Sequence, residues 1–286
     1  MMSLPMLHGA ALALVAGAIA LPLPAGVAAA NLIGNCEMTG AKGDMAIAAP
    51  ARVGQLTVAV NLPAPIWWNG DSPATIKDGY EYCLAAAIAW HSGFDKLQIV
   101  NADWGPLVAG QLKDFDFALS EIAITDEHRT AADFSVPYFD LDVGVLVKKA
   151  TAIDEHSIKT MRVGVLQNSA AAAVVTAALK LKSMNSFAEE GELFTALRSG
   201  QIDAAIADMP IVLTEELQET GVLEVAGQYK SGRVYGALYP KGSTNAAAFN
   251  STITALQVDG TLKRLAGKYF TPVWGKDPAT VPYFNP

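Results

Sequence analysis

Segments typical of strands and of helices alternate along this chain in two successive series, and this alternation constrains the fold more than any other feature of the sequence. In the first series, strand-like runs at 55–62, 97–102 and 115–120 alternate with helix-like segments at 78–93 and 104–114. The second series has strand-like runs at 162–167, 185–188 and 202–208 and helix-like segments at 169–182, 189–201 and 210–221. Such alternation predicts an α/β protein with two lobes.

Length and composition agree with two lobes. The chain has 286 residues, of which 51% are hydrophobic and 17% are charged, so it can bury a sizeable core and is longer than one ordinary domain. We expect a leader over 1–30, an N-terminal arm over 31–54, the first part of lobe 1 over 55–146, lobe 2 over 147–234, a return to lobe 1 over 235–270 and a C-terminal tail over 271–286.

The first 30 residues contain no Asp, Glu, Lys or Arg and predict a secretory signal peptide. Their apolar stretch ends in small residues at 28–30, which indicates cleavage after Ala30 and export to the periplasm. A membrane anchor is the alternative. It is disfavoured because Pro22, Pro24 and Gly26 interrupt the stretch before it reaches the ~20 apolar residues needed to span a bilayer.

The two cysteines of the chain, Cys36 and Cys83, predict one disulfide bond between the arm and lobe 1. An even pair in an exported chain favours this pairing, and the alternative is one buried and one exposed free thiol. Lipid attachment at Cys36 is disfavoured because Asn35 stands where a lipoprotein signal has a small residue.

Charge and missing motifs exclude several function classes. The net charge of −8 argues against a nucleic-acid partner. The four histidines, at 8, 91, 128 and 156, lack the spacing of metal ligands, and the chain contains no GxGxxG, phosphate-loop or GxSxG motif. We therefore expect no metal, no cofactor and no catalytic residues.

Two tryptophans and two acids stand where open α/β sheets bind ligands, near the carboxyl ends of strands. Trp67 and Trp104 could stack on a ligand or face a cation, and ordinary core packing is the alternative for each. Glu121 and Asp208 could each pair with an ammonium group. For Asp208, which stands two residues before a proline, an N-cap of the next helix is the alternative.

Two segments carry a family resemblance. They are "DWGPLVAGQLKDFDFALSEIAITDEHRTAADFSVPYF" at 103–139 and the stretch from "VGVLQNSAAAAVV" to "LFTALRSGQIDAAIADMPIVL" within 163–213. They resemble the family 3 extracellular solute-binding proteins, which serve polar amino acid ABC importers. The resemblance implies a type II periplasmic binding protein fold, in which two lobes are joined by two crossing strands, placed here near 145–147 and 235–237.

The resemblance also assigns roles to residues, with departures from the family pattern. An Arg three residues after the motif's Thr binds the ligand carboxylate in this family, but that position is His128 here, and Arg129 follows it. We expect His128 in the site and Arg129 on its rim. A Ser or Thr that also holds the carboxylate is replaced by Ala123, and a Ser-Thr loop of lobe 2 keeps only Ser169.

Other positions keep the family pattern and give a functional expectation. Asp208 matches the amine-binding acid and Trp104 the stacking aromatic, while Glu121 adds negative charge. The resemblance thus implies a monomeric periplasmic protein that captures a small amine-bearing solute for an inner-membrane ABC permease. Two rivals stay open: a dehydratase-like enzyme on the same fold, and an accessory partner of a periplasmic oxidoreductase.

Overall fold

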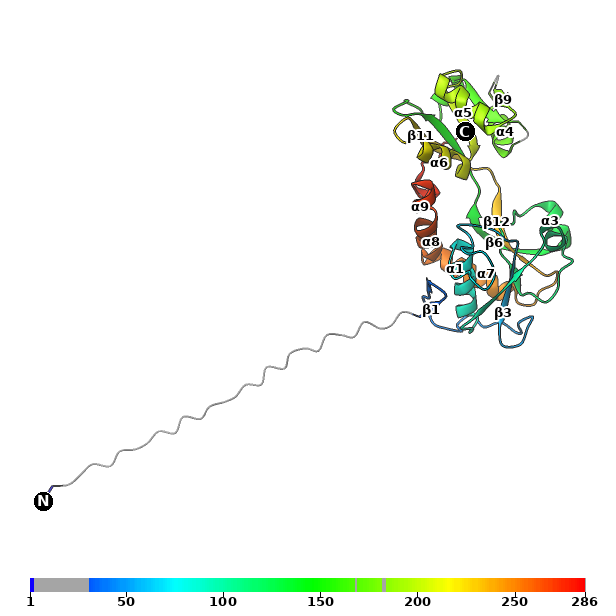
Figure 1. Ribbon diagram of the computed structural model, residues 1–286, viewed down its shortest axis with the longest axis vertical. Coiled ribbons are helices and arrows are strands. Elements are labelled where there is room, and N and C mark those ends of the chain that lie inside the picture. Colours follow the sequence, from blue (N-terminus) through cyan, green and yellow to red (C-terminus); the bar gives the residue numbers. More distant parts are fainter. Residues whose placement is uncertain (3–30, 168, 182–183, 286) are drawn as a thin grey trace. The chain divides into compact units, whose positions relative to one another are not determined.

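The computed structural model describes residues 1–2, 31–167, 169–181 and 184–285 (Figure 1). Residues 3–30 of the predicted signal peptide lie outside the described residues, so the leader stays a prediction. Within the described ranges, no helix is long and apolar enough to cross a membrane.

The first sheet has the strand order β4-β3-β5-β12-β6. Its strands are β3 (Leu56–Val60), β4 (Leu97–Asn101), β5 (Phe117–Ala118), β6 (Asp133–Asp140) and β12 (Val234–Tyr239). Strand β3 runs parallel to β4 and β5, and β12 is antiparallel to β5 and β6. All five residues of β3 are buried, as expected for a continuous apolar strand covered on both faces.

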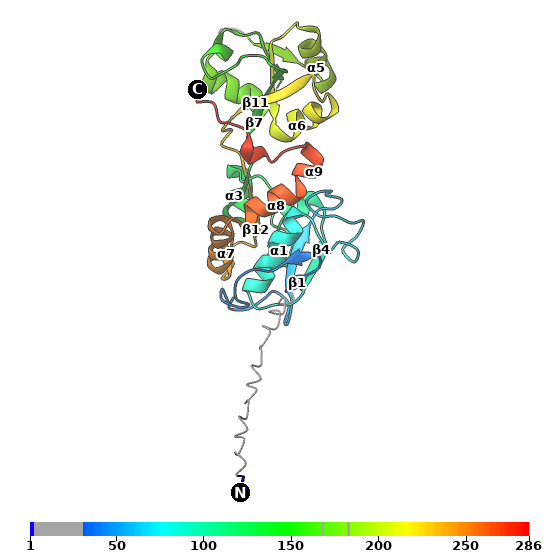
Figure 2. The same ribbon diagram turned by 90° about the vertical axis from the view of Figure 1, so that its left-hand side faces the viewer.

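Helices cover the first sheet and bury its apolar side chains. They are α1 (Tyr80–His91), α2 (Trp104–Val108), α3 (Asp126–Ala131), α7 (Ala246–Val258) and α8 (Thr261–Tyr269). Helix α1 is buried nearly all round, because it packs against β4 and against both α7 and α8 (Figure 2). Its run of alanines supplies the small side chains that such close packing on several sides needs.

The second sheet has the order β11-β7-β10-β8-β9. Its strands are β7 (Val143–Lys148), β8 (Val163–Leu166), β9 (Asn185–Phe187), β10 (Ala204–Asp208) and β11 (Leu223–Tyr229). Strands β8, β9 and β10 are parallel, and β7 is antiparallel to both of its neighbours. The accompanying helices are α4 (Ala170–Val174), continued by a π-helical turn over Val175–Leu179, α5 (Glu190–Ser199) and α6 (Met209–Gln218). The predicted two-lobed α/β architecture is confirmed.

The chain passes between the sheets twice, and both crossings differ from the expected positions. It leaves the first sheet after β6 and enters the second at β7, so the first crossing is at 141–142. It returns between β11 and β12, at 230–233. Residues 145–147 instead pair with β10 and β11, and 235–237 lie within β12. The sequence misled because apolar, strand-like runs follow each crossing, at 143–147 and 234–239, and the expected positions lie within these runs.

The C-terminal segment returns to the second sheet. After α9 (Thr271–Trp274) and a short 3-10 turn (Pro278–Thr280), Tyr283 bridges Gln228 of β11. The backbone N–H of Gln228 donates to the carbonyl of Pro282 at 2.9 Å. Figure 2 shows this last segment running beside β7 and β11. Residues 271–285 therefore add a further connection to the second sheet, whereas the exact limits expected for each lobe stay a prediction.

A disulfide bond joins Cys36 to Cys83, as predicted, and the free-thiol alternative is wrong. Cys36 belongs to a two-stranded hairpin of β1 (Leu32–Ile33) and β2 (Cys36–Glu37), and Cys83 lies in α1. The bond thus ties the N-terminal arm to the helix that the first sheet buries. Both cysteines are almost fully buried.

Candidate functional site

A short segment after β5 begins the candidate site, and β12 holds it in place. Ile124 donates its backbone N–H to the carbonyl of Val234 at 3.0 Å, and Gly236 donates to the carbonyl of Ile122 at 3.1 Å. Ala123 lies between these contacts and forms an isolated bridge with Tyr235. Residues 122–124 are therefore fixed beside the start of β12, just after the second crossing.

Helix α3 starts at the end of this segment and positions His128. The side chain of Thr125 caps the helix by accepting the backbone N–H of His128 at 3.1 Å. Nδ1 of the His128 ring lies 2.8 Å from the carbonyl oxygen of Ala123. Because a carbonyl oxygen only accepts, Nδ1 carries a proton in this contact, and Nε2 is the ring nitrogen left for a ligand. When the ring is neutral, Nε2 accepts a ligand N–H.

Trp104 and Arg129 flank His128 in different ways. Trp104 opens α2 beyond the end of β4, is 42% exposed, and has its ring centroid 6.4 Å from that of His128 in an edge-to-face arrangement. The other side of the His128 ring stacks on Phe134, with centroids 6.3 Å apart. Arg129 is exposed on α3. Trp104 and His128 are thus brought together, and the exposure of Trp104 leaves its ring available to a ligand.

Trp67, by contrast, lies in the core. It is only 5% exposed, and its ring contacts those of Tyr80, Phe139 and Tyr235 edge to face. Core packing, the alternative considered for this residue, describes its surroundings. A ligand could stack on Trp67 only after these rings had moved.

Glu121 lies next to a second acid, Glu81, which the sequence analysis did not single out. The backbone N–H of Glu121 donates to Oε1 of Glu81 at 2.8 Å, and Glu121 adopts a left-handed backbone with φ of 53°. Burial, followed by the charge of Glu81, raises the pKa of Glu121 to about 7. The only sequence signal for Glu81 is an acid inside an otherwise apolar helix.

Glu81 itself is fully buried on α1. Its carboxylate accepts hydrogen bonds from the Trp68 indole N–H at 2.7 Å and from the Tyr138 hydroxyl, besides that from Glu121. Burial raises the pKa of Glu81 to about 7, although the three hydrogen bonds act in the opposite direction. This acid therefore joins α1, the loop after β3, β6 and the Glu121 turn.

Ser169 and Asp208 are the two candidate residues on the second sheet. Ser169 caps α4, accepting the N–H of Ala172 at 3.1 Å and donating to the carbonyl of Leu166 at 2.7 Å. Asp208 ends β10 and precedes α6 without making a side-chain cap. Its Oδ2 instead accepts from the guanidinium of Arg233 at 2.8 Å, while its buried Oδ1 has no hydrogen-bond partner among the described residues.

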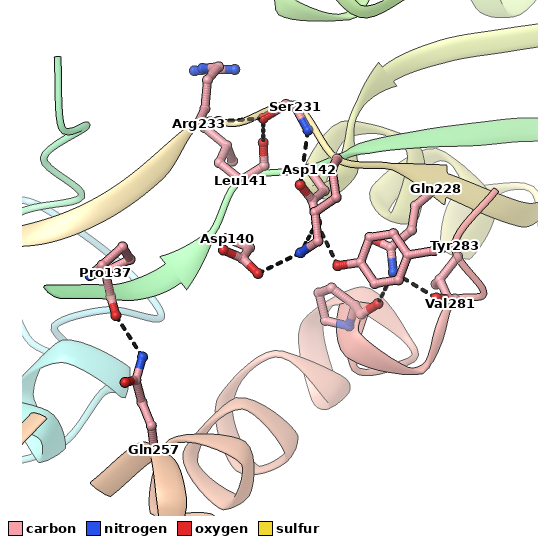
Figure 3. A network of polar contacts seen from close by, with 12 residues as sticks. Pro137, Asp140, Leu141, Asp142, Gln228, Ser231, Arg233, Gln257, Val281 and Tyr283 are labelled. Atoms are coloured by element: carbon pink, nitrogen blue, oxygen red, sulfur yellow. Dashed lines mark hydrogen bonds and ion pairs between the residues drawn. The ribbon is translucent and has the colours of Figure 1, made fainter. Parts of the chain in front are cut away.

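A polar network surrounds the crossings (Figure 3). The ammonium of Lys230 contacts Asp140 at 2.7 Å and Asp142 at 3.1 Å, and the hydroxyl of Tyr283 donates to Asp142 at 2.6 Å. Figure 3 shows the Arg233 side chain extending away from these residues. Lys230 thus neutralises Asp140 and Asp142, whereas the side chain of Arg233 points away from both acids.

Comparison with known proteins decides the family. The sequence model of the bacterial extracellular solute-binding proteins, family 3, matches residues 56–272. The chain belongs to this family. Among curated relatives, the L-cystine-binding protein TcyJ of Escherichia coli is 27% identical over 197 residues, covering 67% of this chain and 74% of the relative. The L-arginine-binding protein of Pseudomonas aeruginosa is also 27% identical, covering 58% of this chain and 69% of the relative.

Solved structures agree with the fold of this solute-binding protein. The L-cystine solute receptor of Neisseria gonorrhoeae, in its unliganded open conformation, matches with a TM-score of 0.62 and 21% identity, covering 78% of this chain and 94% of the receptor. An ancestral cyclohexadienyl dehydratase matches with a TM-score of 0.60 and 23% identity, covering 76% of this chain and 93% of the dehydratase. At these identities the likeness establishes the type II periplasmic binding protein fold alone.

Proposed function

We propose that this solute-binding protein captures a small polar solute that carries an amine, an amino acid or an analogue of one, and delivers it in the periplasm to an inner-membrane ABC permease. The residues proposed to contact the solute are Trp104, Glu121, Ala123, His128, Ser169 and Asp208, with Arg129 on the rim and Trp67 behind them. We further propose that the protein acts as a monomer.

Asp208 is the observation that carries this proposal. Its carboxylate lies at the carboxyl end of a parallel strand, where α/β proteins bind ligands, and it does not cap the following helix. Because Oδ1 is buried and without a hydrogen-bond partner in the described ranges, it lacks a donor that an ammonium group would provide. An acid in this state favours a cationic group as its ligand.

The candidate residues near the first sheet also favour a ligand that carries an amine. Glu121 adds a second carboxyl group, Trp104 presents an exposed aromatic ring, and Nε2 of His128 is the ring nitrogen that the fold leaves for a ligand. The relatives named for L-cystine and L-arginine bind amino acids, which carry an ammonium group. These features together favour an amine-bearing solute over a dicarboxylate.

Isothermal titration of the purified protein with a panel of amino acids and dicarboxylates tests the proposal. We expect amine-bearing solutes to bind and Asp208→Asn to weaken that binding about 10- to 100-fold, the effect of losing one charge-assisted hydrogen bond. Asp203→Asn is a matched control, because Asp203 forms an ion pair with Arg162 at the other end of the same strand. Tight binding that Asp208→Asn leaves unchanged would refute this site.

Two rival functions are separated by other measurements. Glu121, with a pKa raised to about 7, is suited to donate or accept a proton, which is the feature that favours a dehydratase-like enzyme. Turnover of cyclic hydroxy acids that is lost in Glu121→Gln would support the enzyme. An accessory role beside an oxidoreductase would be indicated by neighbouring genes that encode such an enzyme and no permease or ATPase.

A further inference from the structure

We propose that Arg233, at the second crossing, supplies the cation that binds the carboxylate of the solute. This inference rests on the proposed function and deepens it, because it defines the solute as a zwitterion held between Arg233 and Asp208. We assign this role to Arg233 because, of the two basic residues of α3, His128 contacts the Ala123 carbonyl and Arg129 is exposed.

The backbone of Arg233 lies beside the turn where this family's pattern places its carboxylate-binding residues. Val234, the next residue, accepts the N–H of Ile124 at 3.0 Å, and Ile124 immediately precedes the helix cap Thr125. The carbonyl of Arg233 also accepts the N–H of Leu141 at 3.0 Å. The backbone of Arg233 is therefore fixed beside both the turn that precedes α3 and the first crossing. Its side chain starts from this position.

Among the described residues, the guanidinium of Arg233 makes one side-chain contact. Its Nη1 donates to Oδ2 of Asp208 at 2.8 Å, and the side chain is 40% exposed. A guanidinium has five N–H donors in a planar fork, so one such contact leaves donors for a ligand carboxylate. Lys230, by comparison, has its ammonium in contact with both Asp140 and Asp142.

The other basic side chains near the turn are poorly suited to the task. The Nδ1–H of His128 is used by the carbonyl of Ala123, which leaves one ring nitrogen, Nε2, for a ligand and no fork of donors. Arg129 is exposed on α3, and its own carbonyl accepts from Lys241 at 3.0 Å. Arg233 is the basic residue already in contact with a candidate site acid.

Charge balance explains why an ion pair can serve as a binding site. Glu121 and Asp208 would repel a carboxylate unless a cation stood beside them. When a zwitterion binds, its ammonium takes the place of Arg233 at Asp208 and its carboxylate takes the place of Asp208 at Arg233. Each of the two charges keeps an opposite charge beside it throughout, which limits the penalty of desolvation as the solute covers them.

The test compares amino acids with the amines that lack their carboxylate. L-Arginine and agmatine, L-lysine and cadaverine, and L-histidine and histamine are titrated into the wild-type protein, Arg233→Gln and Arg162→Gln. The last variant is a matched control, because Arg162 forms an exposed ion pair with Asp203. We expect the wild type to prefer at least one amino acid over its amine, and Arg233→Gln to reduce that preference about 10- to 100-fold, the effect of one charge-assisted contact.

The outcomes separate this inference from the proposed function. Equal losses of amino acid and amine affinity in Arg233→Gln, or an unchanged preference, would overturn the role of Arg233 while leaving amine binding intact. Loss of the preference in Arg129→Gln alone would assign the role to Arg129 instead. Failure of every probe to bind the wild type would refute the proposed function itself. Arg233→Lys, which keeps the charge without the fork, replaces Arg233→Gln if that variant does not fold, and an intermediate preference is expected.

Discussion

Glu81 and Asp208 are both acids close to the proposed site, and they differ in how far the protein itself supplies hydrogen-bond donors to their oxygens. Glu81 is fully buried and accepts three hydrogen bonds from its own chain. Asp208 has a single charged partner, Arg233, and leaves one oxygen without a donor in the described part of the chain. An acid with all its bonds made within the fold holds elements together, whereas an acid with a spare oxygen can exchange its partner for a ligand.

The largest expected effect concerns Glu81. We expect Glu81→Ala to lower the free energy of unfolding by about 3–5 kcal/mol, because the Trp68 indole and the Tyr138 hydroxyl lose their buried acceptor. Asp208→Ala should cost less than about 1 kcal/mol, because its partner Arg233 reaches solvent. Urea denaturation followed by circular dichroism measures both. Equal losses in the two variants would remove the distinction drawn between the two acids.

The pH dependence of the free energy of unfolding gives a second test of the comparison, because Glu81 titrates together with its neighbour Glu121. The pKa values of Glu81 and Glu121 are raised from 4.5 to about 7 in the folded protein. Between pH 4.5 and 7 the folded state therefore binds more protons than the unfolded state, and the stability contributed by these groups falls as the pH rises through this window.

Glu121→Gln removes one of the two titrating groups. We expect the stability difference between pH 5 and pH 8 to shrink by on the order of 1 kcal/mol, after allowance for partial solvent contact. Thermal unfolding at a series of pH values provides the measurement, and the exposed Glu37 gives the control variant Glu37→Gln. A pH dependence as steep as that of the wild type would show that Glu121 titrates normally.

The smallest expected effect lies at the crossings, where Tyr283 and Arg233 are on different sides (Figure 3). Tyr283→Phe removes one hydrogen bond to Asp142, which keeps its contacts with Lys230 and the backbone of Ser231. We expect a loss of about 1 kcal/mol in stability with unchanged solute affinity. Chemical denaturation and titration of the same sample test this. A weakened affinity would mean that the C-terminal segment contributes to binding and not only to the fold.

Much of the fold was predictable because local signals agree with the final structure. The apolar run of β3 and the alanine-rich α1 have the composition and spacing of the elements they form. The disulfide followed from an even cysteine count in a chain with a predicted leader. The crossings were placed a few residues late, because the apolar runs that follow 141–142 and 230–233 have the pattern expected of a crossing strand.

The candidate site was only partly predictable, because its partners come from distant parts of the chain. The spacing from Thr125 identified His128, but the contact of its ring with the Ala123 carbonyl required coordinates. Asp208 was recognised from its place at the end of a strand, whereas its bond to Arg233 joins the end of β10 to the second crossing. Trp67 and Trp104 both stand near the carboxyl ends of strands, and although the resemblance favoured Trp104, only the structure shows that Trp67 is buried and Trp104 exposed.

The sequence by itself determined the α/β class, the two-lobed family fold, the cysteine pairing and the loss of arginine at the expected carboxylate position. The α/β class, the two lobes and the cysteine pairing depend on periodicity, composition and cysteine count along the chain, whereas the family fold and the missing arginine are what the resemblance to the family implies. Tertiary structure alone decided that Glu81 is enclosed by three donors, that Asp208 is not, and that a hinge arginine stands beside it. The physical reason is that burial and hydrogen bonding of a charge depend on groups far apart in sequence, and the fold must bring them together before either can be known.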